Sequence, residues 1–304
     1  MQSLIIINDC AFFLFICIHE INFKSSTLEY HMSTKIKVTL GRVQETLLLP
    51  LASRAKETEY QQPLLNDTKA VALFNLLEVD RKKILRNLTE IGVQGLAYRA
   101  YKMDEAIKQF LQKNPKGKIL DIGAGLDTTF YRCDNGTALW YDLDLPDSIA
   151  LRKQLLPEPN NRVTYIAKSM LDYSWIDDIG DISNGLFITI PGVLPYFKEE
   201  DVKQFLCTIA TKLKGAEIMF DVISNFGKFF VDVRIKAAGM KEAHLEWAIL
   251  DTKKIATWSP HIEFIQAIKF FENMPTSNLK LMTKAALFFN KQFDMTQLVR
   301  LRFV

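Results

Sequence analysis

The residues with the clearest chemical pattern lie between positions 116 and 146. This segment reads KGKILDIGAGLDTTFYRCDNGTALWYDLDLP, that is, an apolar strand, a glycine turn, a helix and a second strand that ends in carboxylates. Gly123 and Gly125 allow a sharp turn and close approach of the backbone to a ligand, because neither carries a Cβ. Asp142 and Asp144 end the second strand, where a carboxylate can accept hydrogen bonds from both hydroxyls of a ribose. The pattern predicts the first half of a nucleotide-binding α/β fold.

The glycine turn lacks one glycine of the dinucleotide fingerprint G-x-G-x-x-G, because Thr128 stands at the third glycine position. A pyrophosphate needs close approach to the following helix, so a cofactor with a ribose and no phosphate fits better. S-adenosylmethionine has these features and is the predicted cofactor. For the motif taken alone, a structural glycine turn in another kind of α/β protein is the alternative.

Further segments follow in an order that resembles one family of methyltransferases. They are ILDIGAGLDTTFYR, WYDLDLPDSIALRKQLLP, IAKSMLDYSWID, GVLPYF and AEIMFDVIS, preceded by TLLLPLASRAKETEYQQPLLNDTKAV. Together they are similar to the leucine carboxyl methyltransferase family and, within it, to the branch of polyketide O-methyltransferases. The resemblance runs from about Thr46 to Val304. It implies an α/β fold of the Rossmann-like methyltransferase type, with a doubly wound, seven-stranded, mostly parallel sheet and S-adenosylmethionine as cofactor.

The resemblance also implies contacts to the two ends of the cofactor. Arg99, in AYRAYKMDEAIKQFL, matches the arginine that grips the carboxylate of the methionine moiety, a task suited to a planar guanidinium. A solvated helix charge is the alternative for Arg99. Asp144 matches the ribose-binding carboxylate, and Asp142 is expected either to support it or to face solvent.

The loops after the first and third predicted strands complete the expected cofactor site, since ligands of open α/β sheets bind beyond the carboxyl ends of the strands. The first loop contributes Gly123, Ala124 and Gly125. By the resemblance, Ser169 and Met170 match positions at the edge of the adenine. Asp172 is expected either to accept a hydrogen bond from the adenine amino group or to cap a helix over residues 173–179.

The loop after the fourth predicted strand departs from the family pattern. Members commonly have a glutamate here, in an AEGVLMY-like run, whereas this chain reads ITIPGVLPYF with Pro191 in its place. A carboxylate is lost and the backbone is stiffened. Tyr196 is retained and is expected to line the acceptor side. Arg54, in the helical segment before the sheet, is expected either to pair with an anionic acceptor or to be a plain surface residue.

The predicted activity is S-adenosylmethionine-dependent transfer of a methyl group to an oxygen, carboxylate or hydroxyl, of a small molecule. No catalytic base is assigned, because a carboxylate with a pKa near ~4 needs none, although a phenol with a pKa near ~10 benefits from one. His244 is expected to be a surface residue beside Glu242 and Glu246. The sequence contains neither an HxxH nor a CxxC spacing, so no motif indicates a metal site.

Three other functions are compatible with parts of the pattern. The first is methylation of a protein C-terminal carboxylate, and the second is a non-catalytic S-adenosylmethionine-binding module, which Pro191 suggests. The third is a nicotinamide-dependent oxidoreductase, against which the missing third glycine argues. Titration with S-adenosylmethionine, S-adenosylhomocysteine and NAD separates these classes.

Composition sets further bounds. The chain has 304 residues, of which 48% are hydrophobic, and a net charge of +3 without a basic block, so nothing indicates nucleic-acid binding. Its 4 cysteines lack metal-type spacing and favour a reducing, cytoplasmic compartment. The N-terminal run at residues 10–18 is shorter than the ~20 residues that span a bilayer, so no membrane association is expected.

Residues 1–31 are expected to be an extension outside the catalytic domain, because the family-like pattern begins only after Met32. We expect one methyltransferase domain over residues 32–304, with a helical lid over about 33–112. Predicted helices include 39–53, ending near Pro50, one from Lys69 capped by Asp67 and Thr68, 104–111, 199–213 and 277–289. Strands are predicted at 118–122, 140–143, 163–167, 186–190, 217–223, 261–271 and 297–304, the last two as an antiparallel hairpin.

Overall fold

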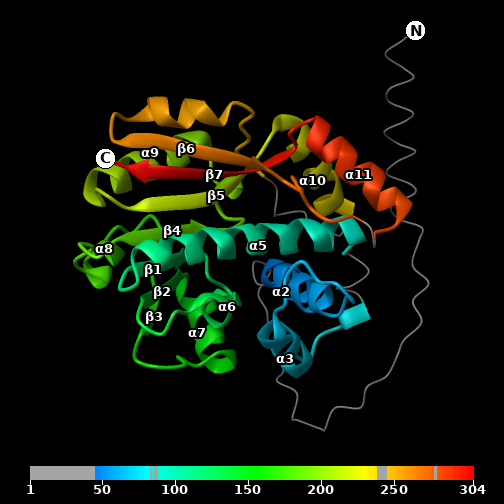
Figure 1. Cartoon of the computed structure of the whole chain (residues 1–304), viewed down its shortest axis with the longest axis horizontal. Coiled ribbons are helices and arrows are strands. Elements are labelled where there is room, and N and C mark those ends of the chain that lie inside the picture. The colour runs from blue at the N-terminus through cyan, green and yellow to red at the C-terminus, as the bar shows by residue number, and fades with distance from the viewer. Residues whose placement is uncertain (1–44, 83, 85–87, 238–244, 277–278) are drawn as a thin grey trace.

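The computed structural model describes residues 45–82, 84, 88–237, 245–276 and 279–304 (Figure 1). The predicted extension over residues 1–31, the first part of the predicted lid and His244 lie outside the described residues. No helix among the described residues is long and apolar enough to cross a membrane.

A seven-stranded sheet with the order β3-β2-β1-β4-β5-β7-β6 forms the centre of the molecule. β1 to β5 pair in parallel, and β7 runs antiparallel to both β5 and β6. The strands are β1 (Lys118–Ile122), β2 (Leu139–Asp144), β3 (Val163–Ala167), β4 (Leu186–Ile190), β5 (Glu217–Ile223), β6 (Ile262–Lys269) and β7 (Thr296–Phe303). The predicted fold class is confirmed, and four of the seven strands have the predicted bounds.

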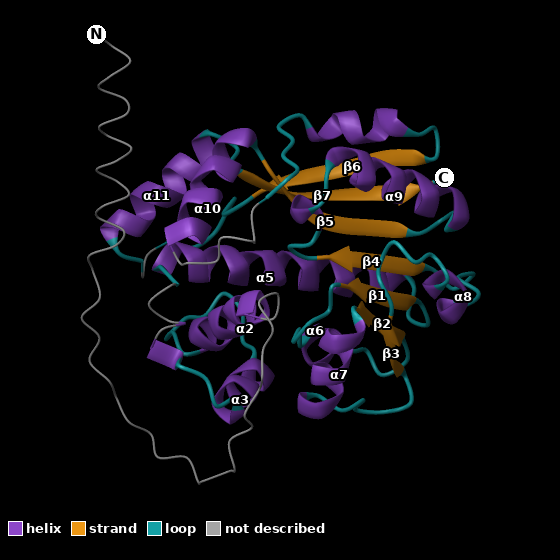
Figure 2. Ribbon diagram, turned by 180° about the vertical axis from the view of Figure 1, so that it is seen from behind, coloured by secondary structure: helices purple, strands orange, loops and turns teal. Residues whose placement is uncertain are grey.

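Helices cover both faces of this sheet (Figure 2). β4 is buried along its whole length, as expected for an apolar strand in the middle of a parallel sheet. One face packs against α8 (Trp175–Ile179) and α9 (Glu199–Lys212). The other face packs against α5 (Glu90–Lys113), α6 (Thr129–Cys133) and α7 (Pro146–Leu155). α5 is therefore part of the sheet packing and extends well beyond the predicted helix over 104–111.

In the described residues before α5, the predicted lid over about 33–112 forms α2 (Glu45–Thr58) and α3 (Thr68–Leu76), called the lid helices below. Asp67 caps α3 by accepting a hydrogen bond from the backbone N–H of Ala70, as predicted. The prediction that the first lid helix ends near Pro50 is wrong, because α2 continues to Thr58. Proline removes one helical hydrogen bond, but α2 buries Leu48 before Pro50 and Leu51, Ala52 and Ala55 after it, and this packing holds the helix.

Two more helices stand at the carboxyl end of the parallel strands. α10 (Asn225–Ala237) begins directly after β5, and α11 (Leu281–Gln292) ends shortly before β7, whose Thr296 pairs with Ile223 at the end of β5. In both views α2 and α3 lie on one side of α5, and α10 and α11 lie on the other (Figures 1 and 2). The 3-10 helix η2 (Thr252–Trp258) packs near β6.

Candidate cofactor and acceptor site

The loop after β1 requires glycine at two positions. Gly123 and Gly125 have φ angles of +76° and +42°, in the left-handed region that side chains disfavour. A Cβ at Gly123 would lie 2.3 Å from Val193, and a Cβ at Gly125 would lie 2.7 Å from Leu47. Ala124, between them, is buried. The loop after β4 and the lid helix α2 therefore close directly on this turn.

Asp144 is fixed beside the glycine turn at the carboxyl end of β2. Its Oδ2 accepts the N–H of Gly125 at 2.7 Å, and its Oδ1 accepts the N–H of Leu145 at 2.7 Å. Burial raises the pKa of this carboxyl group, and the two backbone hydrogen bonds oppose the rise. The side chain remains partly exposed, so each oxygen keeps room for a further donor.

Asp142 has a different role from Asp144. It is buried and pairs with Arg152, whose Nη2 and Nε lie 2.6 Å and 3.0 Å from its Oδ2. Arg152 Nη1 in turn donates to the carbonyl oxygens of Gly125 and Asp127, at 3.0 Å and 2.8 Å. Of the two expectations for Asp142, the supporting role agrees with the structure, because Asp142 holds the arginine that holds the glycine turn.

Arg99 reaches from α5 to the carboxyl ends of β4 and β5. Its Nη1 lies 3.1 Å from Asp221 Oδ2, and the other oxygen of Asp221 accepts the N–H of Gly192 at 2.6 Å. Gly192 has a φ of +70°, and a Cβ there would lie 2.5 Å from Arg99 Nη1. The Arg99 side chain is only 13% exposed. The alternative of a solvated helix charge is therefore wrong.

Tyr196 is the last residue of the 3-10 helix η1 (Leu194–Tyr196), which contacts β5. Burial raises the pKa of its hydroxyl, the Arg99 guanidinium opposes the rise, and Asp221 and Asp232 add to it. The charged groups that act on the Tyr196 hydroxyl are therefore Arg99, Asp221 and Asp232 of α10. Tyr196 still has 40% of its surface exposed, so it can contact a bound molecule.

The loop after β3 holds the three residues expected near the adenine. Ser169 is partly exposed, and its Oγ accepts the N–H of Leu171. The Met170 side chain is buried in the core, and its carbonyl oxygen accepts the indole N–H of Trp175 at 3.0 Å. Asp172 is exposed, and its Oδ1 accepts the N–H of Ser174 at the start of α8, which favours the capping alternative. Hydrogen bonds from Ser174 lower the pKa of Asp172.

Comparisons with known proteins identify the chain's family. A sequence model described as leucine carboxyl methyltransferase matches residues 47–210, more than half of the chain. The chain belongs to the leucine carboxyl methyltransferase family. It is 28% identical over 230 residues to the tetracenomycin polyketide synthesis O-methyltransferase TcmP of Streptomyces glaucescens, covering 75% of this chain and 83% of that protein. It is also 26% identical over 247 residues to the S-adenosyl-L-methionine-dependent methyltransferase dpfgK of Gibberella zeae, covering 76% and 83%.

Solved structures share the fold of this family member. One is a DUF574 family protein from Streptomyces avermitilis, with a TM-score of 0.53 and 12% identity, covering 83% of this chain and 96% of that one. Another is a putative methyltransferase from Thermobifida fusca, with a TM-score of 0.51 and 13% identity, covering 83% and 94%. The chain is an S-adenosylmethionine-dependent methyltransferase with a Rossmann-like fold, as its family and relatives show.

The donor set at the strand ends fits the cofactor of the family. Asp144 presents carboxylate oxygens, which suit ribose hydroxyls, and Arg99 presents guanidinium N–H groups, which suit a carboxylate. The turn at Gly123 and Gly125 adjoins Asp144, and its two Cβ positions are taken up by the close approach of Val193 and Leu47. Among the described residues, no group of three or more His, Cys, Asp or Glu side chains could hold a metal ion.

Arg54 is not placed for contact with an acceptor, and both expectations for it fail. The side chain is 5% exposed, with Nε 3.1 Å from Asp67 Oδ2 and Nη1 3.3 Å from Asp127 Oδ2. Its Nη2 donates to the carbonyl oxygen of Leu126 at 2.9 Å. All three guanidinium nitrogens are engaged by protein oxygens, so Arg54 joins the lid to the loop after β1 instead of facing a substrate.

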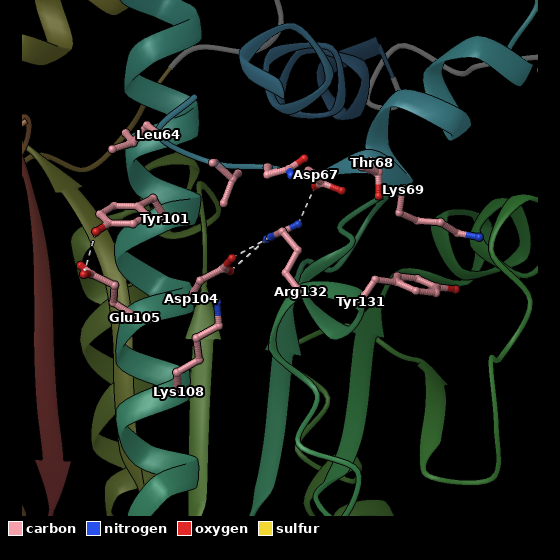
Figure 3. Close-up of a pocket in the computed structure, with 12 residues that line it drawn as sticks. Leu64, Asp67, Thr68, Lys69, Tyr101, Asp104, Glu105, Lys108, Tyr131 and Arg132 are labelled. Carbon is pink, nitrogen blue, oxygen red and sulfur yellow. Dashed lines mark hydrogen bonds and ion pairs between the residues drawn. The ribbon is translucent and has the colours of Figure 1, made fainter. Parts of the chain in front are cut away.

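A buried charge network extends this connection to α5 and α6 (Figure 3). Arg132 donates to both oxygens of Asp104, at 2.7 Å and 3.0 Å, and to Asp67 Oδ2 at 2.6 Å. Thr128, the residue at the missing third glycine position, donates its hydroxyl to Asp67 and is fully buried. A pocket of about 290 Å³ adjoins the network, lined by Tyr101, Asp104, Arg132 and neighbouring side chains. The described residues that line it include none of those expected to bind the cofactor.

Four contacts at the site were not predicted from the sequence. Leu47 and Val193 are ordinary apolar residues whose approach to the glycine turn depends on tertiary packing. Gly192 carries a weak signal as a glycine beside a proline. Asp221 had the most informative signal, since it is a carboxylate within the otherwise apolar strand segment EIMFDVI.

Proposed function

We propose that this methyltransferase transfers the methyl group of S-adenosylmethionine to an oxygen atom of a small molecule. The observation that carries the proposal is the position of Tyr196, a partly exposed phenol next to the Arg99–Asp221 pair and α10. A partly exposed phenol beside this ion pair supports a polar acceptor side at the carboxyl ends of β4 and β5. The relative TcmP, named for O-methylation in polyketide synthesis, supports oxygen as the acceptor atom.

In this proposal the cofactor contacts come from the carboxyl ends of β2 and β3 and from α5. Asp144 accepts hydrogen bonds from the ribose hydroxyls, and Arg99 pairs with the carboxylate of the methionine moiety. Ser169 and Met170 lie along the adenine edge, while Asp172 remains at the rim as a cap of the turn before α8. When bound, S-adenosylmethionine supplies a methyl group on an activated sulfonium.

The chain's own residues then orient the acceptor: a carboxylate is already ionised and needs no base, whereas a phenol would release its proton to solvent. Tyr196 has a raised pKa, so its hydroxyl stays protonated at neutral pH and can donate a hydrogen bond to an acceptor oxygen. Asp232, the nearest carboxylate on α10, is paired with Lys228 at 2.7 Å. Orientation by such groups can supply ~7–11 kcal/mol of the barrier to an in-line displacement.

The first test is binding. Calorimetric titration with S-adenosylmethionine, S-adenosylhomocysteine and NAD is expected to show binding of the first two and none of NAD. Asp134→Asn, which removes the Arg162 ion pair at the amino ends of β2 and β3, serves as a matched control and is expected to bind the cofactor normally.

The second test is turnover. Release of S-adenosylhomocysteine is measured with a panel of carboxylic acids and phenols, with and without a chelator, and with a peptide that ends in a free leucine carboxylate. Turnover of a small acid or phenol that persists with chelator supports the proposal. Turnover of the peptide alone would identify a protein methyltransferase, and cofactor binding without any turnover would favour a binding module.

A further inference from the structure

The Arg99–Asp221 pair offers two opposite charges side by side at the place where the methionine end of the cofactor is proposed to lie. Arg99 Nη1 and Asp221 Oδ2 are 3.1 Å apart, and the two side chains are 13% and 11% exposed. The pair comes from α5 and β5, two elements that meet only in the folded structure. It therefore forms a fixed dipole that faces the turn after β4.

Both side chains retain hydrogen-bonding capacity in this arrangement. Within the described part of the chain, the only hydrogen bond of the Arg99 guanidinium runs from Nη1 to Asp221, so Nε and Nη2 can serve another acceptor. The Asp221 carboxylate accepts one N–H at each oxygen, from Gly192 and from Arg99, and a carboxylate can accept about four. The pair can thus bind a second pair of charges without breaking its own contact.

The side chains of the turn, from Pro191 to Val193, offer no charged partner to a cationic group. Pro191 has neither a polar side chain nor a backbone N–H, and Val193 packs against Gly123. Asp221 is the carboxylate that the structure places in contact with this turn, through the 2.6 Å hydrogen bond to Gly192.

The methionine moiety of S-adenosylmethionine is a zwitterion, with an α-carboxylate and an α-ammonium group on one carbon. An arginine alone would attract the carboxylate and repel the ammonium, because like charges a few ångströms apart in a desolvated site repel strongly. An arginine next to an aspartate attracts both groups, because the arginine can pair with the carboxylate and the aspartate with the ammonium.

We propose that Asp221 binds the α-ammonium group of the cofactor while Arg99 binds its α-carboxylate. This inference rests on the proposed role of Arg99 and assigns the second half of the same subsite. Asp221 then determines specificity for an amino-acid end and is more than a support for the turn at Gly192.

The test uses S-adenosylhomocysteine and two analogues of it, one without the α-amino group and one without the α-carboxylate. Affinities are measured by calorimetry for the wild type and for Asp221→Asn, which keeps an oxygen for the Gly192 N–H but removes the charge. Arg99→Gln provides the reciprocal variant, and Asp134→Asn is the control for loss of a similar ion pair far from the turn.

We expect Asp221→Asn to weaken S-adenosylhomocysteine about 10- to 100-fold, as for truncation of one partner of a desolvated charge pair. The same variant should weaken the deaminated analogue less than about threefold, because the partner of Asp221 is already gone. Arg99→Gln should show the reciprocal pattern with the decarboxylated analogue, and Asp134→Asn should change neither affinity.

Equal losses for S-adenosylhomocysteine and the deaminated analogue in Asp221→Asn would show that Asp221 only supports the turn, and would overturn the inference. If that variant does not fold, the wild type alone decides. The wild type must then bind the deaminated analogue more than about tenfold more weakly than S-adenosylhomocysteine, and a smaller loss of affinity overturns the inference. Failure of the wild type to bind S-adenosylhomocysteine at all would instead refute the proposed function.

Discussion

Leu47 of the lid helix α2 packs directly over Gly125 in the turn after β1, so that a Cβ at position 125 would lie 2.7 Å from Leu47 Cδ2. The lid therefore touches the backbone that also donates to Asp144. Arg54 of α2 donates a hydrogen bond to the carbonyl oxygen of Leu126, the residue that follows Gly125. The position of the lid and the shape of the cofactor turn are set by the same contacts.

This relationship predicts that Gly125→Ala combines two separable costs. Left-handed backbone costs a non-glycine residue about 1–2 kcal/mol, and the clash with Leu47 adds to it. Gly136→Ala is the matched control, because Gly136 has a φ of +82° but no heavy atom within 4 Å of its Cβ position. Thermal or denaturant unfolding should show a larger loss for Gly125→Ala. The additional change Leu47→Ala should lower the excess, and an excess unchanged by it would contradict the clash.

Mutation of Asp144 is predicted to lower cofactor affinity, whereas mutation of Asp142 is predicted to lower the free energy of unfolding. Asp144→Asn should weaken S-adenosylhomocysteine binding by ~1.5–3 kcal/mol, the worth of hydrogen bonds to a charged group. Asp142→Asn leaves the buried Arg152 without its charge partner and should lower the free energy of unfolding by ~3–5 kcal/mol. Calorimetry and denaturant unfolding of both variants measure this contrast. A larger loss of affinity in Asp142→Asn, in protein shown to be folded, would assign the ribose to Asp142.

Local patterns in the sequence predicted most of the fold. β1, β3, β4 and β5 are short apolar runs between turn residues, and the structure has them at the predicted positions. Helix ends were less predictable where packing overrides local preference. α2 runs through Pro50 because Leu51 and Ala55 are buried against its neighbours. In α5, residues 90–103 continue the predicted segment and pack against α2 and the residues after β6, as Gln94 and Tyr98 show.

Site residues could be predicted where the local sequence explains the residue type, but not where their role depends on contacts between distant segments. Glycines with positive φ and the carboxylate at a strand end can be recognised in the sequence, as Gly123 and Asp144 show. The partner of Arg99 cannot, because Asp221 lies 122 residues away and meets it only through the β4–β5 pairing. Arg54 was misjudged for the same reason, since its acceptors come from α3 and the turn after β1.

Two buried carboxyl groups near the glycine turn should give opposite pH effects on stability. Burial, reinforced by the charges of Asp127 and Asp142, holds the pKa of Asp121 well above its usual value near ~3.9. For Asp127, burial alone would raise the pKa, but Arg54 and Arg132 outweigh it and hold the pKa below the usual value.

The sign follows from which state holds the proton. Folded Asp121 keeps its proton to higher pH than the unfolded chain, so its contribution to stability is complete below about pH 4 and falls as pH rises through its folded pKa. Asp127 contributes above about pH 4, and its contribution is lost as pH falls below that value. Relative to wild type, Asp121→Asn should therefore gain stability with rising pH. Asp127→Asn should have a free energy of unfolding below that of the wild type, by a constant amount above about pH 5 and by a smaller amount in acid.

Denaturant unfolding between pH 3 and 8 tests both variants. If the difference in unfolding free energy between Asp121→Asn and the wild type does not change with pH, the assignment is contradicted.

Tyr196 is predicted to serve the acceptor and not the cofactor. Its ring is 40% exposed beside the Arg99–Asp221 pair, and its raised pKa keeps the hydroxyl as a donor at neutral pH. Tyr196→Phe removes that donor and leaves the ring, so turnover should fall while cofactor affinity changes by less than ~0.5 kcal/mol. Tyr173→Phe, at a ring that stacks against Phe205 of α9, is the control and should leave turnover unchanged. Both are measured on the acceptor that the panel identifies, together with calorimetry of S-adenosylhomocysteine. Equal turnover in wild type and Tyr196→Phe would remove the hydroxyl from the acceptor side, whereas a large loss of cofactor affinity would place Tyr196 in the cofactor subsite.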